Sequence, residues 1–192
     1  MLKLWPVADP VQVRAEGLVL REWQPSDIPA LIALYDTAEM DRWTPVASPF
    51  DVEAARRYLE TAHRAREQWG TVQMAITEDG WTVLGEMLAF PADSPDVVEL
   101  AYAVAAAHKG RGLATRAVTA VLKLAANAGV TRARLLIAFD NATSRRVAQR
   151  TGFSLMDRPL IERRRKGYVL RLETWERLLT SAPSPPRSDA PD

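Results

Sequence analysis

The loop Ala107–Ala114, with the sequence AHKGRGLA, constrains this chain more than any other segment. It follows a β-prone run and precedes Leu113–Ala128, whose apolar residues recur at helical spacing. Gly110 and Gly112 allow successive backbone N–H groups to point into one concavity, and the N-terminal end of the following helix adds a positive dipole end. The segment therefore predicts a strand, an anion cradle and a helix, in that order.

The same loop has two competing interpretations. It lacks both the Gly-Lys-Ser/Thr ending of a P-loop and the third glycine of a dinucleotide fingerprint, which argues against a nucleotide-binding protein. An ordinary glycine-bearing turn is the other alternative. The strand before the loop, the helix after it and the positive charges of Lys109 and Arg111 favour a pyrophosphate ligand instead.

The composition excludes several kinds of chemistry. The chain has 192 residues, 47% of them hydrophobic, which suits one core and one domain. It has no cysteine, and neither His63 nor His108 has a second histidine at metal-ligand spacing, so no metal site is expected. A net charge of +1 does not indicate nucleic-acid binding, and no apolar stretch approaches the roughly 20 residues of a membrane span. We therefore expect a cytoplasmic protein without nucleic-acid or membrane partners.

The order of the elements indicates an α/β fold. The Asp79-Gly80 turn predicts two antiparallel strands, and the crossover over Leu113–Ala128 predicts a parallel pair. Helices are expected after Pro25, after the N-caps Asp51 and Asn141, and over Leu113–Ala128. The seven expected strands are Leu18–Arg21, Thr71–Thr77, Trp81–Phe90, Val97–Val104, Arg134–Phe139, Phe153–Met156 and Tyr168–Leu172.

A second motif, Asn141-Ala142-Thr143-Ser144 followed by Gly152-Phe153, lies some thirty residues after the loop. Together with Lys109–Ala114 it resembles the GNAT superfamily of N-acetyltransferases, whose Arg/Gln-x-x-Gly-x-Gly/Ala loop binds the pyrophosphate of acetyl-coenzyme A. Lys109 replaces the usual arginine or glutamine, which keeps the charge but loses the planar fork. The resemblance runs from about Leu18 to Trp175. The second motif looks most like the Rim-type branch, whose better-known members acetylate protein N-terminal amines.

This resemblance implies a GNAT fold, a mixed central sheet of about seven strands with helices on both faces. A V-shaped splay is expected between the parallel strands Val97–Val104 and Arg134–Phe139, and the pantetheine arm of acetyl-coenzyme A enters it. Residues 17–180 would form this domain, after an N-terminal arm over residues 1–16. The implied coenzyme-binding residues are Ala103, Val104, Lys109, Gly110, Arg111, Gly112, Leu113, Ala114, Asn141 and Arg146.

The resemblance also implies groups for the proton transfers. Glu99 would act on the amine through water, with an exposed strand carboxylate as the alternative. Ser144 would stabilise the leaving thiolate, with a helix-surface serine as the alternative. Ala148 stands where many family members carry a tyrosine acid, so a non-catalytic coenzyme A-binding or regulatory module remains the rival to direct acetyl transfer in a ternary complex.

The remaining features concern the acceptor and the surface. The acceptor is expected to be a primary amine, on a protein N-terminus or a small molecule, and Trp43 in the acceptor region favours an apolar flank. The cluster Arg163–Lys166 is interpreted as a solvated face or hairpin tip. The tail over residues 181–192, rich in proline and serine, is predicted to be disordered. The sequence does not decide whether the protein forms a homodimer.

Overall fold

The computed structural model describes residues 11–92, 94–165 and 167–180, so the tail predicted over residues 181–192 lies outside the described residues. Five α-helices appear in this part of the chain, α1 (Ile28–Tyr35), α2 (Ala38–Trp43), α3 (Val52–Trp69), α4 (Leu113–Asn127) and α5 (Ala142–Arg150). The strands are β1 (Gln12–Ala15), β2 (Leu18–Glu22), β3 (Val72–Thr77), β4 (Gly85–Pro91), β5 (Val97–Val104), β6 (Arg132–Ala138), β7 (Ser154–Leu155), β8 (Ile161–Arg165) and β9 (Tyr168–Leu178).

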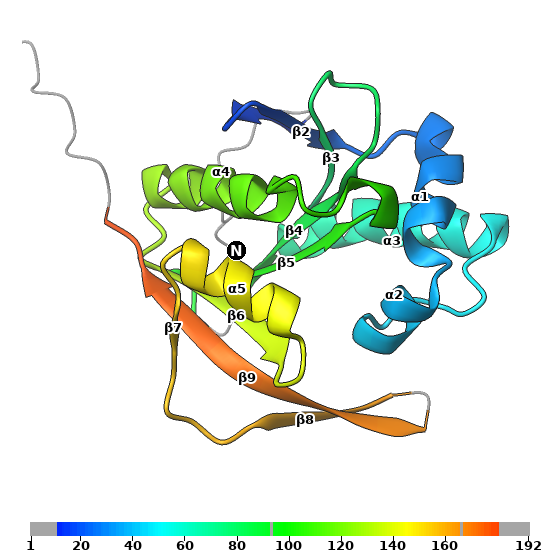
Figure 1. The fold of residues 1–192 in the computed structure, drawn as a ribbon. Coiled ribbons are helices and arrows are strands. Elements are labelled where there is room, and N and C mark those ends of the chain that lie inside the picture. Colours follow the sequence, from blue (N-terminus) through cyan, green and yellow to red (C-terminus); the bar gives the residue numbers. More distant parts are fainter. Residues whose placement is uncertain (1–10, 93, 166, 181–192) are drawn as a thin grey trace, which may run out of the picture.

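All nine strands belong to one open mixed sheet (Figure 1). Its order is β1-β2-β3-β4-β5-β6-β9, and both β7 and β8 pair with β9. Every pairing is antiparallel except that between β5 and β6. The predicted α/β fold and its parallel pair are confirmed, while β1 and β8 add two strands to the seven expected.

The parallel pair separates halfway along its length. Ladder pairing runs from Val97 opposite Arg132 to Leu100 opposite Leu135, and it stops there. The rest of β5 keeps its pairing with β4, and the rest of β6 keeps its pairing with β9. The two strands therefore diverge after Leu100 and Leu135, which is the predicted splay.

Helices cover both faces of the sheet, as predicted (Figure 1). Helix α4 packs on one face, where residues such as Ala117 and Val121 join the side chains of the central strands in the main core. On the other face, α1 and α3 enclose a second core that includes Leu31, Phe50 and Ala103. Alternate residues of β4 and β5 therefore face different helices.

The helix boundaries follow local capping signals. The Asp51 side chain accepts a hydrogen bond from the Ala54 N–H at 2.8 Å, and α3 ends at Gly70, which has a left-handed φ of 70°. The Asn141 side chain caps α5 by accepting from the Ser144 N–H at 3.0 Å. Both predicted N-caps are confirmed.

The expected strand Trp81–Phe90 was too long at its start, because β4 begins only at Gly85. The Asp79 carboxylate accepts hydrogen bonds from the N–H groups of Trp81 and Thr82, at 2.7 and 2.8 Å. These bonds hold an Asx-type turn, so the hairpin loop is longer than a two-residue turn. The antiparallel pairing of β3 with β4 is as predicted.

Candidate active site

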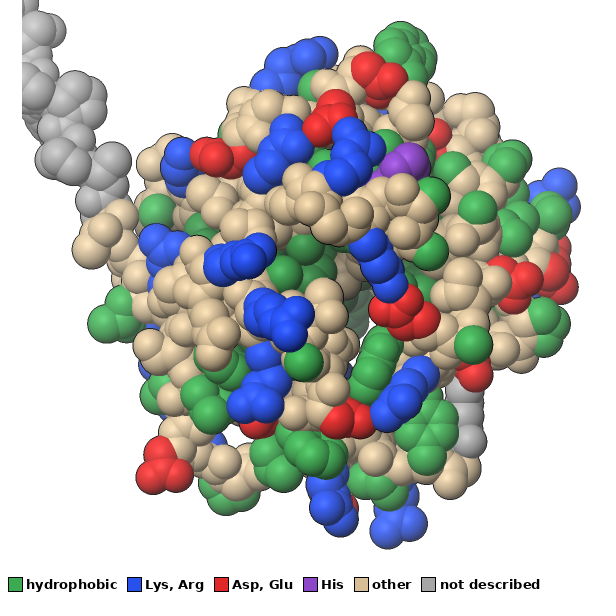
Figure 2. All heavy atoms as spheres, in the orientation of Figure 1, with side chains coloured by type: hydrophobic (Ala, Val, Ile, Leu, Met, Phe, Trp, Pro, Cys, Tyr) green, Lys and Arg blue, Asp and Glu red, His purple; other side chains and the backbone are tan. Residues whose placement is uncertain are grey.

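A cavity of about 900 Å³ opens where β5 and β6 diverge. Its wall is made by the second half of β5, the loop before α4, the first turns of α4 and α5, and part of α2. Figure 2 shows this face of the molecule hollowed, with Lys and Arg side chains around the rim. The cavity brings together segments that are far apart in the sequence.

The N-terminal end of α4 forms one side of the cavity. Gly110 and Gly112 both have left-handed backbone conformations, with φ of 80° and 73°, and no described atom lies within 4 Å of where a Cβ would be. No described side chain caps α4, so the N–H groups of its first turn, at Leu113, Ala114 and Thr115, lack helical partners and line the cavity. This end suits a bound anion such as pyrophosphate.

The predicted cations of this loop have carboxylate partners. Lys109 lines the cavity, and its ammonium group pairs with Glu39 of α2. The Arg111 guanidinium pairs with Glu78, which also pairs with Arg116 at 2.8 Å. The hydrogen bond from Arg116 is the main reason why the pKa of Glu78 is lowered. Lys109 therefore lies at the cavity as expected, whereas Arg111 does not line it, and both charges are paired with carboxylates from other elements.

The arginines of α5 differ in their surroundings. Arg145 pairs with Glu173 of β9, with Nε to Oε2 at 3.3 Å, and it is not among the residues that line the cavity. Arg146 and Arg150 are exposed and line the cavity, and neither has an ion-pair partner among the residues that the structure describes. Of the three, these two are available to an incoming phosphate.

The start of α5 places Asn141 and Ser144 on the cavity wall. Asn141 uses its amide oxygen as the helix cap, which leaves its amide nitrogen for another partner. Tyr102 of β5 donates a hydrogen bond to the Ser144 carbonyl at 3.2 Å, and burial raises the pKa of Tyr102 to about 12. Tyr102 is therefore protonated at neutral pH, and its hydroxyl links β5 to α5.

The β5 residues Glu99, Ala103 and Val104 all line the cavity. Glu99 and Ala103 share one face of the strand, four residues apart, and Val104 faces the opposite side. Ala148, at the position where the resemblance leads one to expect a tyrosine, is completely buried in the main core. The cavity therefore receives no hydroxyl from that position.

A buried carboxylate next to the cavity, with three aromatic hydrogen-bond donors, was not predicted. Glu86 of β4 is 0% exposed and accepts hydrogen bonds from the side chains of Trp23, Tyr35 and Tyr58. Burial raises the pKa of Glu86 to about 7, although the three hydrogen bonds oppose that rise. The one sequence signal was a charged residue inside the apolar run Val83–Phe90. Its partners come from distant elements, so they could not be read from that run.

Metal-binding clusters and membrane-spanning helices are both absent from the described residues. Within the described ranges, no group of three or more His, Cys, Asp or Glu side chains lies close enough to hold a metal ion. No helix in this part of the chain has both the length and the apolar character needed to cross a membrane.

Comparison with solved structures shows the same fold in several acetyltransferases. RimJ of Mycobacterium smegmatis, solved with a coenzyme A disulfide, has a TM-score of 0.73 and 20% identity, covering 88% of this chain and 86% of that one. The ribosomal L7/L12 α-N-protein acetyltransferase RimL, solved with coenzyme A, has a TM-score of 0.73 and 18% identity, covering 92% and 98%. The microcin C7 self-immunity acetyltransferase MccE, solved with acetyl-CoA and AMP, has a TM-score of 0.72 and 15% identity, covering 84% and 92%.

Sequence comparisons give the family. No curated protein sequence matches the chain. The family model described as an acetyltransferase (GNAT) domain matches residues 17–154, which include both motifs, the splayed strands and the uncapped end of α4. The cavity, its glycine loop and this match lead to one conclusion, that the chain belongs to the GNAT acetyltransferase family.

Proposed function

We propose that this protein is an acetyl-coenzyme A-dependent N-acetyltransferase that passes the acetyl group directly to a primary amine bound in the same cavity. One observation carries the proposal: the uncapped N-terminus of α4 and the splay between β5 and β6 open into a single cavity of about 900 Å³. That volume lies in the usual range for small-molecule sites, and it leaves room for an acceptor beside the coenzyme arm.

The residues on the cavity wall fit the coenzyme. Backbone N–H groups over Gly110–Ala114 would hold the pyrophosphate, while Arg146 or Arg150 would meet the 3′-phosphate. Backbone groups of Ala103 and Val104 would hold the pantetheine arm, and the amide nitrogen of Asn141 would add a bond to it or to a water. An N–H near Val104 that polarises the acetyl carbonyl is worth about 2.7–4 kcal/mol if it acts as a single oxyanion donor.

The acceptor side of the cavity is apolar and aromatic. Met40, Trp43, Pro45, Val46 and Phe90 line it. These side chains favour a primary amine with an apolar flank, either a protein N-terminus, as for the α-N-protein acetyltransferase RimL, or a small molecule. Glu99 is proposed to act on the amine through water and Ser144 to stabilise the leaving thiolate.

The buried Ala148 supports one alternative, a coenzyme A-binding module without catalysis. Such a module would keep the anion site at α4 and lack an effective acid. Binding experiments do not distinguish the two functions, because both need the coenzyme. Multiple-turnover release of free thiol from acetyl-coenzyme A, in the presence of an amine, distinguishes them.

The test of the coenzyme site is Gly112→Asp. Aspartate tolerates the left-handed conformation better than most residues, and the position has open space, so the fold should persist. Its carboxylate would repel the pyrophosphate. Acetyl-coenzyme A at a hundredfold excess over its Kd should stabilise the wild type by about 2.7 kcal/mol, and thermal-shift measurements should show most of that gain lost in the variant.

Gly129→Asp is the matched control. Gly129 also has a left-handed φ, of 85°, and open space around it, but it lies just beyond the C-terminal end of α4. This variant should retain the full response to acetyl-coenzyme A. Equal responses in wild type and Gly112→Asp would contradict the coenzyme site. The accompanying activity assay uses alkylamines, arylalkylamines, polyamines and short peptides with free N-termini.

A further inference from the structure

We propose that Tyr58 and Gln73 bind the ammonium group of the acceptor, and that buried Glu86 is the positioning residue that draws its proton away through Tyr58. The inference rests on the proposed function, because it assigns the place of the amine in that same cavity. It concerns the sheet face beneath α1 and α3, where no motif lies.

The register of the sheet places Glu86 beside the expected reaction centre. Glu86 is the Cα partner of Ala103, which lines the cavity and lies where the acetyl group is expected. Directly opposed residues of antiparallel strands have Cα atoms about 4.5–5.5 Å apart. Glu99, four residues further from the acetyl end on the same strand face, is about 13 Å from Ala103 along β5. The Cα of Glu86 is thus nearer to Ala103 than the Cα of Glu99 is, although Glu99 itself lines the cavity.

Two tyrosines separate Glu86 from the cavity. Tyr35 of α1 and Tyr58 of α3 line the cavity, and both hydroxyls donate to the same carboxylate oxygen of Glu86, Tyr58 at 2.7 Å. Trp23 donates its indole N–H to the other oxygen at 2.7 Å. Each tyrosine oxygen keeps lone pairs that can accept a hydrogen bond from an ammonium group. Tyr58 is the less buried of the two residues, so we assign the contact with the acceptor to its hydroxyl.

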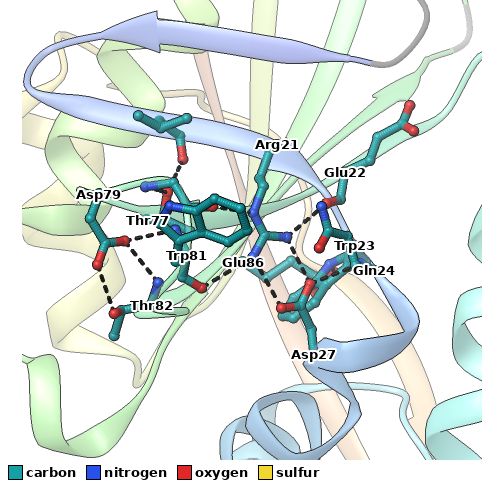
Figure 3. A network of polar contacts seen from close by, with 12 residues as sticks. Arg21, Glu22, Trp23, Gln24, Asp27, Thr77, Asp79, Trp81, Thr82 and Glu86 are labelled. Atoms are coloured by element: carbon teal, nitrogen blue, oxygen red, sulfur yellow. Dashed lines mark hydrogen bonds and ion pairs between the residues drawn. The ribbon is translucent and has the colours of Figure 1, made fainter.

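Glu86 has no cation beside it among the residues that the structure describes. The ionisable groups that face it are Tyr35 from α1, Tyr58 from α3 and Arg21 from β2. Arg21 lies two strands away, because it is opposite Ala75 of β3, which is in turn opposite Glu86. The Arg21 guanidinium is held by Asp27 through two hydrogen bonds, at 2.7 and 3.0 Å (Figure 3). A buried carboxylate without a counter-charge is costly, and an acceptor ammonium would supply one.

Gln73 of β3 adds an independent observation. Its side-chain oxygen is buried and has no hydrogen-bond partner in the described part of the chain, yet the residue lines the cavity. Gln73 is opposite Leu88, so it is a diagonal neighbour of Glu86 on the same sheet face, about 7–8 Å away. Buried polar atoms normally have partners, and an N–H donor from the acceptor would satisfy this one.

The proposed relay moves one proton from the acceptor ammonium to Glu86 through Tyr58. The ammonium gives a proton to the Tyr58 oxygen while the Tyr58 hydroxyl proton passes to the Glu86 carboxylate, which leaves a neutral amine, a neutral tyrosine and a neutral carboxyl group. The amine nitrogen then attacks the thioester carbonyl carbon, and the C–S bond breaks. The second proton of the nitrogen goes to the thiolate, so the products are the amide and free thiol, and Glu86 later releases its proton to water. Because burial raises the pKa of Glu86 to about 7, it can both accept and release that proton near neutrality.

The test is steady-state thiol release by the full chain between pH 5.5 and 9.5, with 2-phenylethylamine and a short peptide with a free N-terminus as probes. Glu86→Gln should lower kcat/KM for the amine by about 10²-fold at pH 7, and the deficit should shrink as the amine itself loses its proton at high pH. The KM for acetyl-coenzyme A should stay unchanged. Tyr58→Phe should show the same pattern in weaker form, and Gln73→Leu should raise the KM for the amine alone. Glu86→Asp should recover part of the rate and the inflection near pH 7.

Glu53→Gln is the control, because it makes the same chemical change on the exposed side of α3, where Glu53 pairs with Arg57. An active wild type whose pH profile is unchanged in both Glu86→Gln and Tyr58→Phe overturns this inference and leaves the proposed function standing. A uniform rate loss at all pH values would also overturn it, since that is what a structural role gives. A folded wild type that releases no thiol with any amine overturns the proposed function and this inference together.

Discussion

Ser144 of α5 and Glu99 of β5 both line the cavity and are proposed for different proton transfers, so substitutions there test separate steps. Ser144→Ala should lower kcat with little change in coenzyme affinity, at the low end of the 10²–10⁴-fold typical of positioned acid-base groups, because a thiolate is a fair leaving group. If Glu99 rather than Glu86 takes the amine proton, Glu99→Gln should steepen the rise of rate with pH. Steady-state kinetics from about pH 6 to 9 measure both, with exposed Ser154→Ala as control.

Each of these two substitutions has a result that would contradict the role proposed for the residue. An unchanged kcat in Ser144→Ala would make that serine a helix-surface residue that only contributes backbone groups to its neighbours. An unchanged pH profile in Glu99→Gln, combined with a changed one in Glu86→Gln, would move the proton acceptor from β5 to β4.

Glu86 should also make stability depend on pH. Its pKa in the folded protein is about 7, against a usual 4.5, so the folded state binds the proton more tightly than the unfolded state does. The resulting stabilisation is complete below about pH 4.5 and is lost as pH rises through about 7; its full size is roughly 3 kcal/mol. Denaturant unfolding of wild type and Glu86→Gln between pH 4.5 and 8 should show the wild type losing stability relative to the variant. A difference that is constant over this range would contradict the assignment.

Sequence reasoning reaches those features that depend on backbone conformation and local order. Gly110 and Gly112 were identified because glycines between a strand and a helix have a local meaning. The partners that hold Lys109 and Arg111 could not be found in this way, since Glu39 and Glu78 are 70 and 33 residues away. The partners of Glu86 escaped prediction for the same reason, since Tyr35 is 51 residues away and Tyr58 is 28.

At the scale of elements, the helices that carry their own capping signals were the most predictable. Helices α3, α4 and α5 each have an apolar stripe, and either an N-cap side chain or a terminal glycine marks their ends. Strand β8 escaped prediction because Ile161–Arg165 is dominated by charged residues, and only pairing with β9 makes it a strand. Strand β9 is longer than expected because it pairs with β6, β7 and β8 in turn.

Gly85 can be read from the sequence, but the reason for a glycine at this position is seen only in the structure. Gly85 starts β4, and a Cβ there would lie 2.3 Å from the Ala103 carbonyl oxygen. Only glycine permits strands β4 and β5 to approach this closely, beside the position proposed for the acetyl group. The same approach sets Glu86, the next residue, against Ala103.

At the scale of the whole molecule, the splay divides the sheet into β1 to β5 on one side and β6 to β9 on the other. Only four residue pairs join the two parts through the β5–β6 ladder, although the main core continues beneath both. The side of β5 that faces the gap after Leu100, and the side of β6 that faces it after Leu135, have no ladder partner there. A coenzyme arm in the gap would supply one.

Hydrogen exchange should detect a coenzyme arm bound in the gap between β5 and β6. In the free protein, backbone amides of residues 101–104 and 136–138 that face the gap should exchange by local opening, because no strand bonds to them. Saturating acetyl-coenzyme A should slow their exchange on both strands, as well as that of the first turn of α4. Gly112→Asp should show neither effect at the same coenzyme concentration, and exposed amides at the start of α3, on the other side of the second core, should be unaffected in both proteins. Protection confined to α4 would mean that the coenzyme is held only by its phosphates and that its arm does not enter the gap, which would remove Ala103 and Val104 from the site.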